Sequence, residues 1–346
     1  MPSGRKTKEG KDIYEKKVVE TTYTADDFDA LYIITKHDGL PMKKILQTKI
    51  PKLIHFSVTG MGATEWEPGV MKYQDMLKRI KHFIKMGLDP EMVTMRIDPI
   101  IPGVTPFEVI EDIVKKSSEM GIKTIKFSVM DWYRSTAPEV TKNTGYDYSK
   151  YYEPELDKDG NPQTYFWCPK DKDGRPIPGP DGKPQWSKHV VYKTHAKVEE
   201  QKKISDFLVS LKDKYGVTLQ SCAEPLIQEG VEKVGCLSVP AINNMLGTHI
   251  EDKGVDNNRQ RELCTCYGGK TDLMSYDQHC ASVCWYCYAH HQGEKMLTYY
   301  NPDGSLKDNA WTRTGYEEES NDIIKTVQDN GKIRLSLPSH TEEKPR

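Results

Sequence analysis

The sequence lacks any long apolar run. No stretch reaches the roughly 18 consecutive apolar residues that a membrane-spanning helix needs. The opening residues Met1 to Lys6 do not have the apolar core of a signal peptide. We therefore expect a cytoplasmic protein that has no membrane partner.

An excess of charge of one sign is also missing. Lysine and arginine total 49, aspartate and glutamate total 51, and the formal net charge is −2. This balance excludes a globally basic nucleic-acid coat but leaves room for a local basic strip. The G-x-G-x-x-G fingerprint and the Walker phosphate loop are absent as well, so neither of these nucleotide sites is predicted.

Alternating apolar segments predict strands over 31–36, 52–59, 92–98, 123–130 and 217–223, and helical spacing predicts helices over 69–87, 105–121 and 197–214. In this interpretation Pro99 stops the third strand and Thr105 caps the helix that follows. Strands separated by helices of this length predict an α/β fold, a partial or irregular (β/α) TIM-like barrel. We expect an N-terminal extension (1–30), a first barrel part (31–143), an insertion (144–195), the rest of the barrel (196–256) and a cysteine-rich C-terminal region (257–346).

The predicted strands carry polar side chains on one face. His55, Ser57 and Thr59 alternate with apolar neighbours, and so do Arg96 and Asp98. A strand buried against helices on both faces is normally apolar throughout. Two interpretations stay open: the polar face encloses a wet cavity, which we favour, or it faces solvent.

The insertion over 144–195 is rich in turn signals and aromatic residues. It follows a strand on the side where active-site loops lie in barrels. One interpretation is a substrate lid with aromatic side chains for stacking and lysines for phosphates. The other is a β-hairpin that uses its own aromatic side chains as a small core.

Cysteine is concentrated near the C-terminus: five of the eight cysteines fall within 24 residues. Metal binding or redox chemistry is the better expectation for such a cluster than disulfides in a cytoplasmic protein. Cys280, Cys284 and Cys287 have the spacing C-x3-C-x2-C. Three thiolates on one loop can bind three irons of a four-iron cluster and leave the fourth iron open for chemistry.

This spacing, with Tyr286 at the aromatic position, resembles the cluster motif of the radical S-adenosylmethionine (SAM) enzymes. The resemblance implies a [4Fe-4S] cluster on these three cysteines and SAM chelated by the open iron. It also implies an external one-electron reductant of the flavodoxin or ferredoxin kind, and cleavage of SAM to a 5′-deoxyadenosyl radical that removes a hydrogen atom from the substrate. Most such enzymes carry the motif directly after the first strand, whereas here it lies about 60 residues before the C-terminus.

A less-studied branch of that superfamily, catalogued as a domain of unknown function, resembles the chain more closely. The branch motif R-x2-C-x-C, acidic residue, Tyr, C-x3-C-x-Y-C-Y-A has its counterparts at Arg261, Cys264, Cys266, Asp272, Tyr276, Cys280, Cys284, Tyr286, Cys287, Tyr288 and Ala289. Upstream likenesses lie in 56–62, 96–99, 127–133 and 222–224. The resemblance to phage-encoded members implies an isomerase acting on hypermodified (glycyl) thymine in DNA, in the host cytoplasm.

The resemblance and the strand pattern together give the candidate site. The candidates for holding SAM are Tyr286, Arg96, Asp98, Ser128 and Glu224; the candidates for posing the substrate or returning a hydrogen atom are Lys126, Asp131, Tyr133 and Lys36. The alternative for the charged strand residues is internal ion pairing, for example of Arg96 with Asp98 or Glu224.

Four further cysteines, Cys222, Cys236, Cys264 and Cys266, have two interpretations. They can hold a second iron–sulfur cluster or a zinc ion, or they can be buried, inert thiols. Two alternatives to the leading function stay open too: a radical enzyme that acts on a peptide or small metabolite, and a non-catalytic iron–sulfur or zinc protein.

Overall fold

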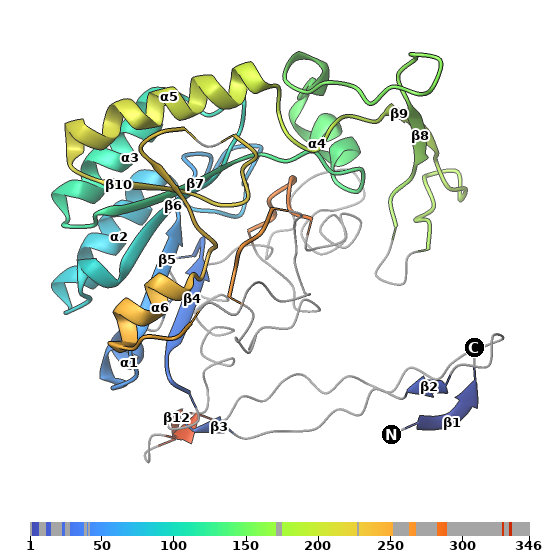
Figure 1. Cartoon of the computed structure of the whole chain (residues 1–346). Helices are drawn as coiled ribbons and strands as arrows, with labels where there is room; N and C mark the ends of the chain where they lie inside the picture. The colour runs from blue at the N-terminus through green and yellow to red at the C-terminus, as the bar shows by residue number, and fades with distance from the viewer. Residues whose placement is uncertain are drawn as a thin grey trace.

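The central feature of the molecule is a six-stranded parallel sheet. The computed structural model describes residues 28–37, 40, 42–170, 175–226, 228–251, 263–267 and 282–288 with their side chains, and the backbone of five short strands nearer the termini. The sheet has the order β11-β10-β7-β6-β5-β4 (Figure 1), and each neighbouring pair is parallel. Its strands are β4 (Leu31–Thr35), β5 (Lys52–Ser57), β6 (Val93–Ile100), β7 (Thr124–Val129), β10 (Thr218–Ser221) and β11 (Val231–Lys233).

The strand order follows the chain order, which is the arrangement that repeated βα units produce. The predicted α/β class and parallel sheet are therefore confirmed. The predicted barrel closure is not shown, because β4 and β11 are the two edges of the described sheet and do not pair with each other. The sheet of the described residues is open.

Helices cover one face of this sheet and build the main core. They are α2 (Tyr73–Lys85), α3 (Phe107–Glu119) and α5 (Val198–Tyr215) (Figure 1). Ile80, Ile110 and Leu208 from these helices are fully buried in one cluster with the strand residues Ile54 and Met95. Burying apolar side chains at every turn of the helices and every second strand position is the main stabilising term of this layer.

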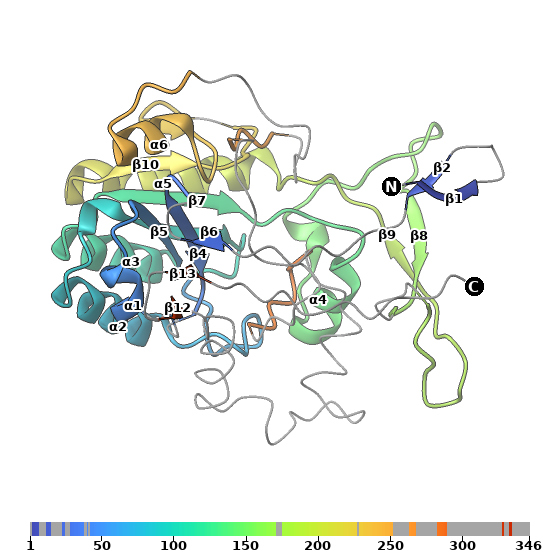
Figure 2. The ribbon, with the colours of Figure 1, turned by 90° about the horizontal axis from the view of Figure 1, so that it is seen from below.

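A second, smaller cluster lies on the opposite face. Leu53, whose side chain alternates with that of Ile54, packs against Leu237 and Ile242. Ile242 belongs to α6 (Val239–Leu246), and a further short helix, α1 (Met42–Gln47), precedes β5. Helix α6 therefore covers the β4–β5 edge of the sheet from the side opposite to α2 and α3, as Figure 2 shows from below.

The structure differs from the sequence prediction at several element ends. Pro99 does not stop β6; the strand continues to Ile100, and its register with β7 is irregular after Ile97, where proline has no N–H to donate to the ladder. Thr105 does not cap α3, because its hydroxyl accepts the N–H of Ile101 and Pro106 occupies the cap position. The sequence analysis also missed α1, α6, β11 and α4 (Ala137–Thr144).

The predicted insertion contains a hairpin of β8 (Thr164–Trp167) and β9 (Ser187–Val190), which projects away from the sheet (Figure 1). Its aromatic side chains divide into two groups. Tyr146, Tyr148 and Tyr152 are buried and join the main core rather than a core of the insertion's own. Phe166 and Trp186 are 68% and 55% exposed. The interpretation of the insertion as a hairpin with a small core of its own is therefore wrong for the three tyrosines, and Phe166 and Trp186 are the exposed aromatic side chains of its described part.

Short strands and turns complete the description. Two single-turn 3-10 helices lie at η2 (Pro90–Met92) and η3 (Tyr148–Lys150). The first thirty residues, to which the sequence assigned no element, contain β1 (Pro2–Lys6), β2 (Asp12–Tyr14) and β3 (Tyr23–Thr24); near the other end lie β12 (Val327–Gln328) and β13 (Lys332–Ile333). They form antiparallel pairs β1–β2, β12–β13 and β13–β3. Among the described helices, none combines the length and apolar character that crossing a membrane requires.

Candidate functional site

The predicted polar side chains gather along the carboxyl edge of the sheet. Lys36 follows β4, Asp98 lies near the end of β6, Asp131 follows β7 and Glu224 follows β10. In parallel α/β sheets this edge is where ligands bind, because successive loops meet there. The fold therefore brings residues from distant parts of the sequence to one side of the molecule.

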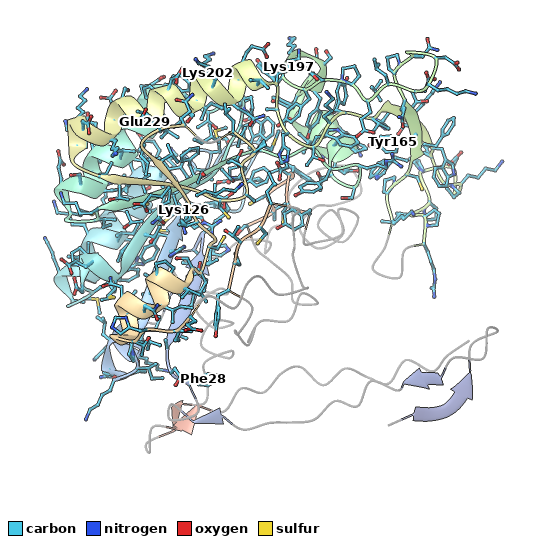
Figure 3. All side chains as sticks on the ribbon, viewed as in Figure 1. Phe28, Lys126, Tyr165, Lys197, Lys202 and Glu229 are labelled. Carbon is cyan, nitrogen blue, oxygen red and sulfur yellow. The ribbon has the colours of Figure 1, made fainter. Side chains whose placement is uncertain are left out.

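The polar face of the strands is buried. His55, Lys126 and Ser128 are at most 2% exposed, and Arg96 is 6% exposed. The interpretation in which this face meets solvent is therefore wrong. Figure 3 shows Lys126 in the middle of the sheet, well away from Tyr165 on the projecting hairpin.

Internal ion pairing on this face is confirmed for one pair. The Arg96 guanidinium pairs with the Asp98 carboxylate, and the Ser128 hydroxyl donates to the other oxygen of the same carboxylate. Glu224 does not join them; its Oε1 accepts the backbone N–H of Val129 at 2.9 Å. Arg96, Asp98 and Ser128 are thus in contact, and Glu224, on the loop after β10, binds the end of β7 instead.

The cysteine loop, residues 282–288, docks on the ends of the first two strands of the sheet. The N–H of Gly69 donates to the carbonyl of Ser282 at 3.2 Å, and the N–H of Trp285 donates to the carbonyl of Trp66 at 3.3 Å. The Ser282 hydroxyl and Nε2 of His37 lie 2.6 Å apart. Although the motif lies far along the chain, it returns in space to the loops that follow β4 and β5.

A buried carboxylate connects this loop to the sheet. Glu67 is 1% exposed and accepts hydrogen bonds from Lys36 Nζ at 2.9 Å, from the Thr59 hydroxyl at 2.7 Å and from the Tyr286 hydroxyl. Lys36 Nζ also donates to the carbonyl of Asp98 at 3.2 Å and lies 5.7 Å from the centre of the Tyr286 ring. Burial raises the pKa of Tyr286 well above its usual value, and the neighbouring Cys284 and Glu67 raise it further. Tyr286 therefore stays a neutral donor to Glu67.

A small cavity of about 10 Å³, room for about one water molecule, lies beside this carboxylate. Lys36, Thr59, Glu67 and Met71 are among the residues that line it, together with the glycine-rich turn after β5. Gly62 in that turn approaches the neighbouring segment closely, since a Cβ there would lie 2.0 Å from the Met71 carbonyl oxygen. Lys36 and Glu67 form a salt bridge at the wall of this cavity, with Lys36 Nζ 2.9 Å from Glu67 Oε1.

Two of the three predicted cluster cysteines belong to the described loop. Cys284 is buried, Cys287 is half-buried, and the Cys287 N–H donates to the Cys284 carbonyl at 3.0 Å in a tight turn. Cys280 lies outside the described residues, as do Arg261, Asp272, Tyr276 and Ala289 of the extended motif. Iron–sulfur clusters are held by cysteine thiolates, so the donor type of Cys284 and Cys287 on this one loop fits such a group.

A second polar group lies next to this loop. Asp131 is buried, and its Oδ1 lies 3.1 Å from Nδ1 of His195 while its Oδ2 accepts the Tyr133 hydroxyl at 3.1 Å. The Tyr133 ring is 5.0 Å from the ring of Tyr288, the residue after Cys287. The predicted pair Asp131 and Tyr133 is therefore in contact and adjoins the cysteine loop.

The four other cysteines also come together, from three separate segments. The sulfurs of Cys222 and Cys236 are 3.3 Å apart, and the Cys236 N–H donates to the Cys266 sulfur at 3.1 Å. Hydrogen bonds from the thiols of Cys222, Cys236 and Cys264 lower the pKa of Cys266. The contact with Cys266 raises the pKa of Cys264. The Cys266 sulfur is therefore in contact with the sulfurs of the other three cysteines.

Two buried cations lie against these thiols. The Arg96 guanidinium donates to the Cys236 sulfur at 3.1 Å, and Lys126 Nζ donates to the carbonyl oxygen of Gly235 at 2.6 Å. Burial lowers the pKa of Lys126, and the neighbouring thiols oppose this shift. Burial, then Lys126 and Arg96, lower the pKa of His55 well below its usual value, so His55 is neutral. Lys126 therefore belongs with the four cysteines rather than with Asp131 and Tyr133.

Sequence reasoning missed three residues of this site. Glu67 lies in a loop without periodicity, and His195 and His37 are isolated in the sequence, so no local pattern marks them. Only the fold shows that Glu67 meets Tyr286 and that His195 meets Asp131. The glycine-rich turn at 60–62 follows a predicted strand, and it was a signal in the sequence that the loop containing Glu67 lies close to another segment.

Comparisons with known proteins add one finding. A family model described as "Domain of unknown function (DUF1848)" matches residues 184–289. This range includes α5, β10, β11 and α6, the four cysteines and the three cysteines of the C-x3-C-x2-C motif. Neither a search of curated proteins nor a search of solved structures found a match. The chain is therefore similar, over residues 184–289, to a family described as a domain of unknown function.

Proposed function

We propose that this chain is a radical SAM enzyme whose cluster ligands are Cys280, Cys284 and Cys287. The observation that carries the proposal is the position of the cysteine loop. It docks on the loops after β4 and β5 through backbone hydrogen bonds to Trp66 and Gly69. Most enzymes of that superfamily carry the motif after the first strand, and contact of the cysteine loop with the loops after β4 and β5 supports the proposal in spite of the motif's late position in the sequence.

The chain's own residues would orient the cofactor and shield it. When bound, the cluster and SAM would supply a 5′-deoxyadenosyl radical that removes a hydrogen atom from the substrate. SAM carries an ammonium group, a carboxylate and a sulfonium, and the Lys36–Glu67 ion pair beside the cysteine loop would have to open for these two side chains to bind the carboxylate and the ammonium group. Trp285 is 3% exposed and closes one side of the loop against solvent.

The substrate side of the proposal rests on Asp131, Tyr133 and His195. Their polar groups meet beside Tyr288 at the carboxyl edge of β7. The Tyr133 hydroxyl could return a hydrogen atom to a substrate radical, which would leave a tyrosyl radical. Re-forming the tyrosine would take one electron from the external reductant and one proton, which the Asp131–His195 pair could supply. Within this proposal the expected substrate is a glycyl-modified thymine in DNA and the expected reaction an isomerisation, with Phe166 and Trp186 available for base stacking.

The competing function is an iron–sulfur electron carrier. A carrier has four protein ligands to its cluster and does not cleave SAM. The test uses anaerobically reconstituted full-length protein with dithionite and SAM, and 5′-deoxyadenosine is quantified by mass spectrometry. The unmodified chain and the Cys168→Ala control, which alters a buried cysteine of the insertion, are expected to form it, and Cys284→Ala is not. Equal product from Cys284→Ala, or none from the unmodified chain with iron bound, would reject the proposal.

A further inference from the structure

The four cysteines beyond the cysteine loop form a compact thiol cluster, which we call the four-thiol cluster: Cys222, Cys236, Cys264 and Cys266. Cys222 directly follows β10, Cys236 lies between β11 and α6, and the other two belong to the described segment 263–267. Cysteines from three segments meet here without belonging to one local motif. These cysteines meet only in the folded chain. The alternative interpretation, four inert thiols at unrelated places in the core, does not account for their contact.

The backbone around the four-thiol cluster is built for close approach. The Tyr267 N–H donates to the Leu237 carbonyl at 2.8 Å, which places the segments of Cys236 and Cys266 side by side. A Cβ at Gly235 would lie 2.6 Å from the Thr265 carbonyl oxygen and 2.7 Å from the Cys266 backbone nitrogen. Only glycine permits this spacing. The Cys236 N–H that points at the Cys266 sulfur is a backbone donor placed to stabilise a thiolate.

The charges around the cluster favour bound thiolates. Arg96 and Lys126 are 6% and 2% exposed, and they approach the cluster from neighbouring positions on β6 and β7. Arg96 shares its charge with Asp98, and its Nε has no hydrogen-bond partner in the described part of the chain. Burying cations is costly unless negative charge lies close by. Four thiolates around a divalent ion carry a net charge of about −2, which is the sign that buried cations beside the cluster require.

Sulfur spacing discriminates between the metal centres that cysteine can hold. In a tetrahedral zinc site, Zn–S bonds of about 2.3 Å place the sulfurs about 3.8 Å apart. The four cysteines of a [4Fe-4S] cluster are held further apart by the width of the metal core. The Cys222–Cys236 distance of 3.3 Å is close to the zinc value. In the described residues no group of three or more His, Cys, Asp or Glu side chains is arranged to hold a metal ion as it stands. Binding would therefore have to draw the four thiols into a tetrahedron, with the Cys222–Cys236 pair spread by about half an ångström.

From these observations we infer that the four-thiol cluster binds one divalent zinc ion, with Cys222, Cys236, Cys264 and Cys266 as its ligands. Four protein ligands close the coordination sphere, so the site is structural. It ties the segment 263–267 to β10 and β11. This inference is independent of the proposed function, because it uses none of the three cysteines of the cysteine loop.

The experiment measures metal per chain in the full-length Cys284→Ala variant, which separates this site from the proposed cluster. The variant is purified after expression with Zn²⁺ in the medium, and zinc and iron are determined by elemental mass spectrometry. The inference predicts about one zinc per chain, retained in Cys284→Ala/Cys168→Ala and lost in Cys284→Ala/Cys266→Ser. Replacement of Zn²⁺ by Co²⁺ is expected to give the ligand-field and thiolate charge-transfer bands of a tetrahedral tetrathiolate.

Several results would overturn the inference. Stoichiometric iron and sulfide in place of zinc in Cys284→Ala would show a second iron–sulfur cluster. Absence of any metal, or a Cys222–Cys236 disulfide in peptide mass spectra, would show a thiol or redox pair instead. Because the prediction of bound zinc applies to the chain with all four cysteines intact, misfolding of the Cys266→Ser variant does not affect that test.

Discussion

The hydrogen bond from Tyr286 to Glu67 is the contact most open to a quantitative test. In Tyr286→Phe the ring remains beside Lys36, while the hydroxyl that donates to the Glu67 carboxylate is removed. Glu67 keeps its bonds from Lys36 and Thr59. The loss is therefore that of one hydrogen bond to a charged group, about 1.5–3 kcal/mol.

This loss is expected to appear as easier opening of the cysteine loop. Two backbone N–H groups report on its docking: Gly69, which donates to Ser282, and Trp285, which donates to Trp66. A cost of about 1.5–3 kcal/mol corresponds to about 10- to 150-fold faster amide hydrogen exchange at both positions. The measurement is hydrogen exchange followed by mass spectrometry on peptides that contain these residues.

The control is Tyr165→Phe. Tyr165 lies on the projecting hairpin, and the substitution removes the hydroxyl that donates to the Arg134 carbonyl. It is expected to leave exchange at Gly69 and Trp285 unchanged. Unchanged exchange in Tyr286→Phe would refute the argument that Glu67 anchors the cysteine loop. Equal acceleration in both variants would show a general loss of stability instead.

Three further predictions concern other parts of the molecule. Folded His55 stays neutral, whereas His55 of the unfolded chain binds a proton below about pH 6.5. The free energy of unfolding should therefore fall by up to about 1.4 kcal/mol for each pH unit between about pH 6.5 and pH 5. Urea titrations should show this slope in the unmodified chain and a smaller slope in His55→Asn. Gly62→Ala should lower the free energy of unfolding by about 1–3 kcal/mol, since its Cβ would overlap the Met71 carbonyl; an unchanged urea midpoint would contradict the close approach. Replacing exposed Phe166 or Trp186 by alanine should weaken binding of single-stranded DNA by about 1–3 kcal/mol per lost stacking contact in a fluorescence titration; equal affinity would argue against the hairpin as a DNA contact.

Most strands of the sheet could be predicted from the sequence, because the alternation of apolar and polar residues that marks a strand is a local pattern. Alternating strands such as the one around Phe56 and the helices with apolar residues at helical spacing were predicted within a few residues of their ends. Short elements were missed because α1 and α6 are too short to establish a period. The end of β6 was misplaced because proline was treated as a strand terminator, whereas the chain passes it with a shift in register.

The candidate site was predictable in its residue types but not in its groupings. The polar alternation placed Arg96, Asp98 and Ser128 on one face, and the structure brings them into contact. Lys126 shares that face but meets the four-thiol cluster through a loop about 110 residues away. Such contacts depend on how loops at the carboxyl edge return over the sheet, and no spacing in the sequence encodes that path. Glu67 was missed for the same reason.

The central claim is that the cysteine loop holds a cluster with an iron open to SAM. The most direct test is electron paramagnetic resonance of the dithionite-reduced, reconstituted protein before and after SAM is added. An open iron that chelates SAM predicts a changed spectrum on addition, and Cys284→Ala should lack both the signal and the change. A reduced cluster whose spectrum is the same with and without SAM would contradict the account, because that is the behaviour of a cluster held by four protein ligands.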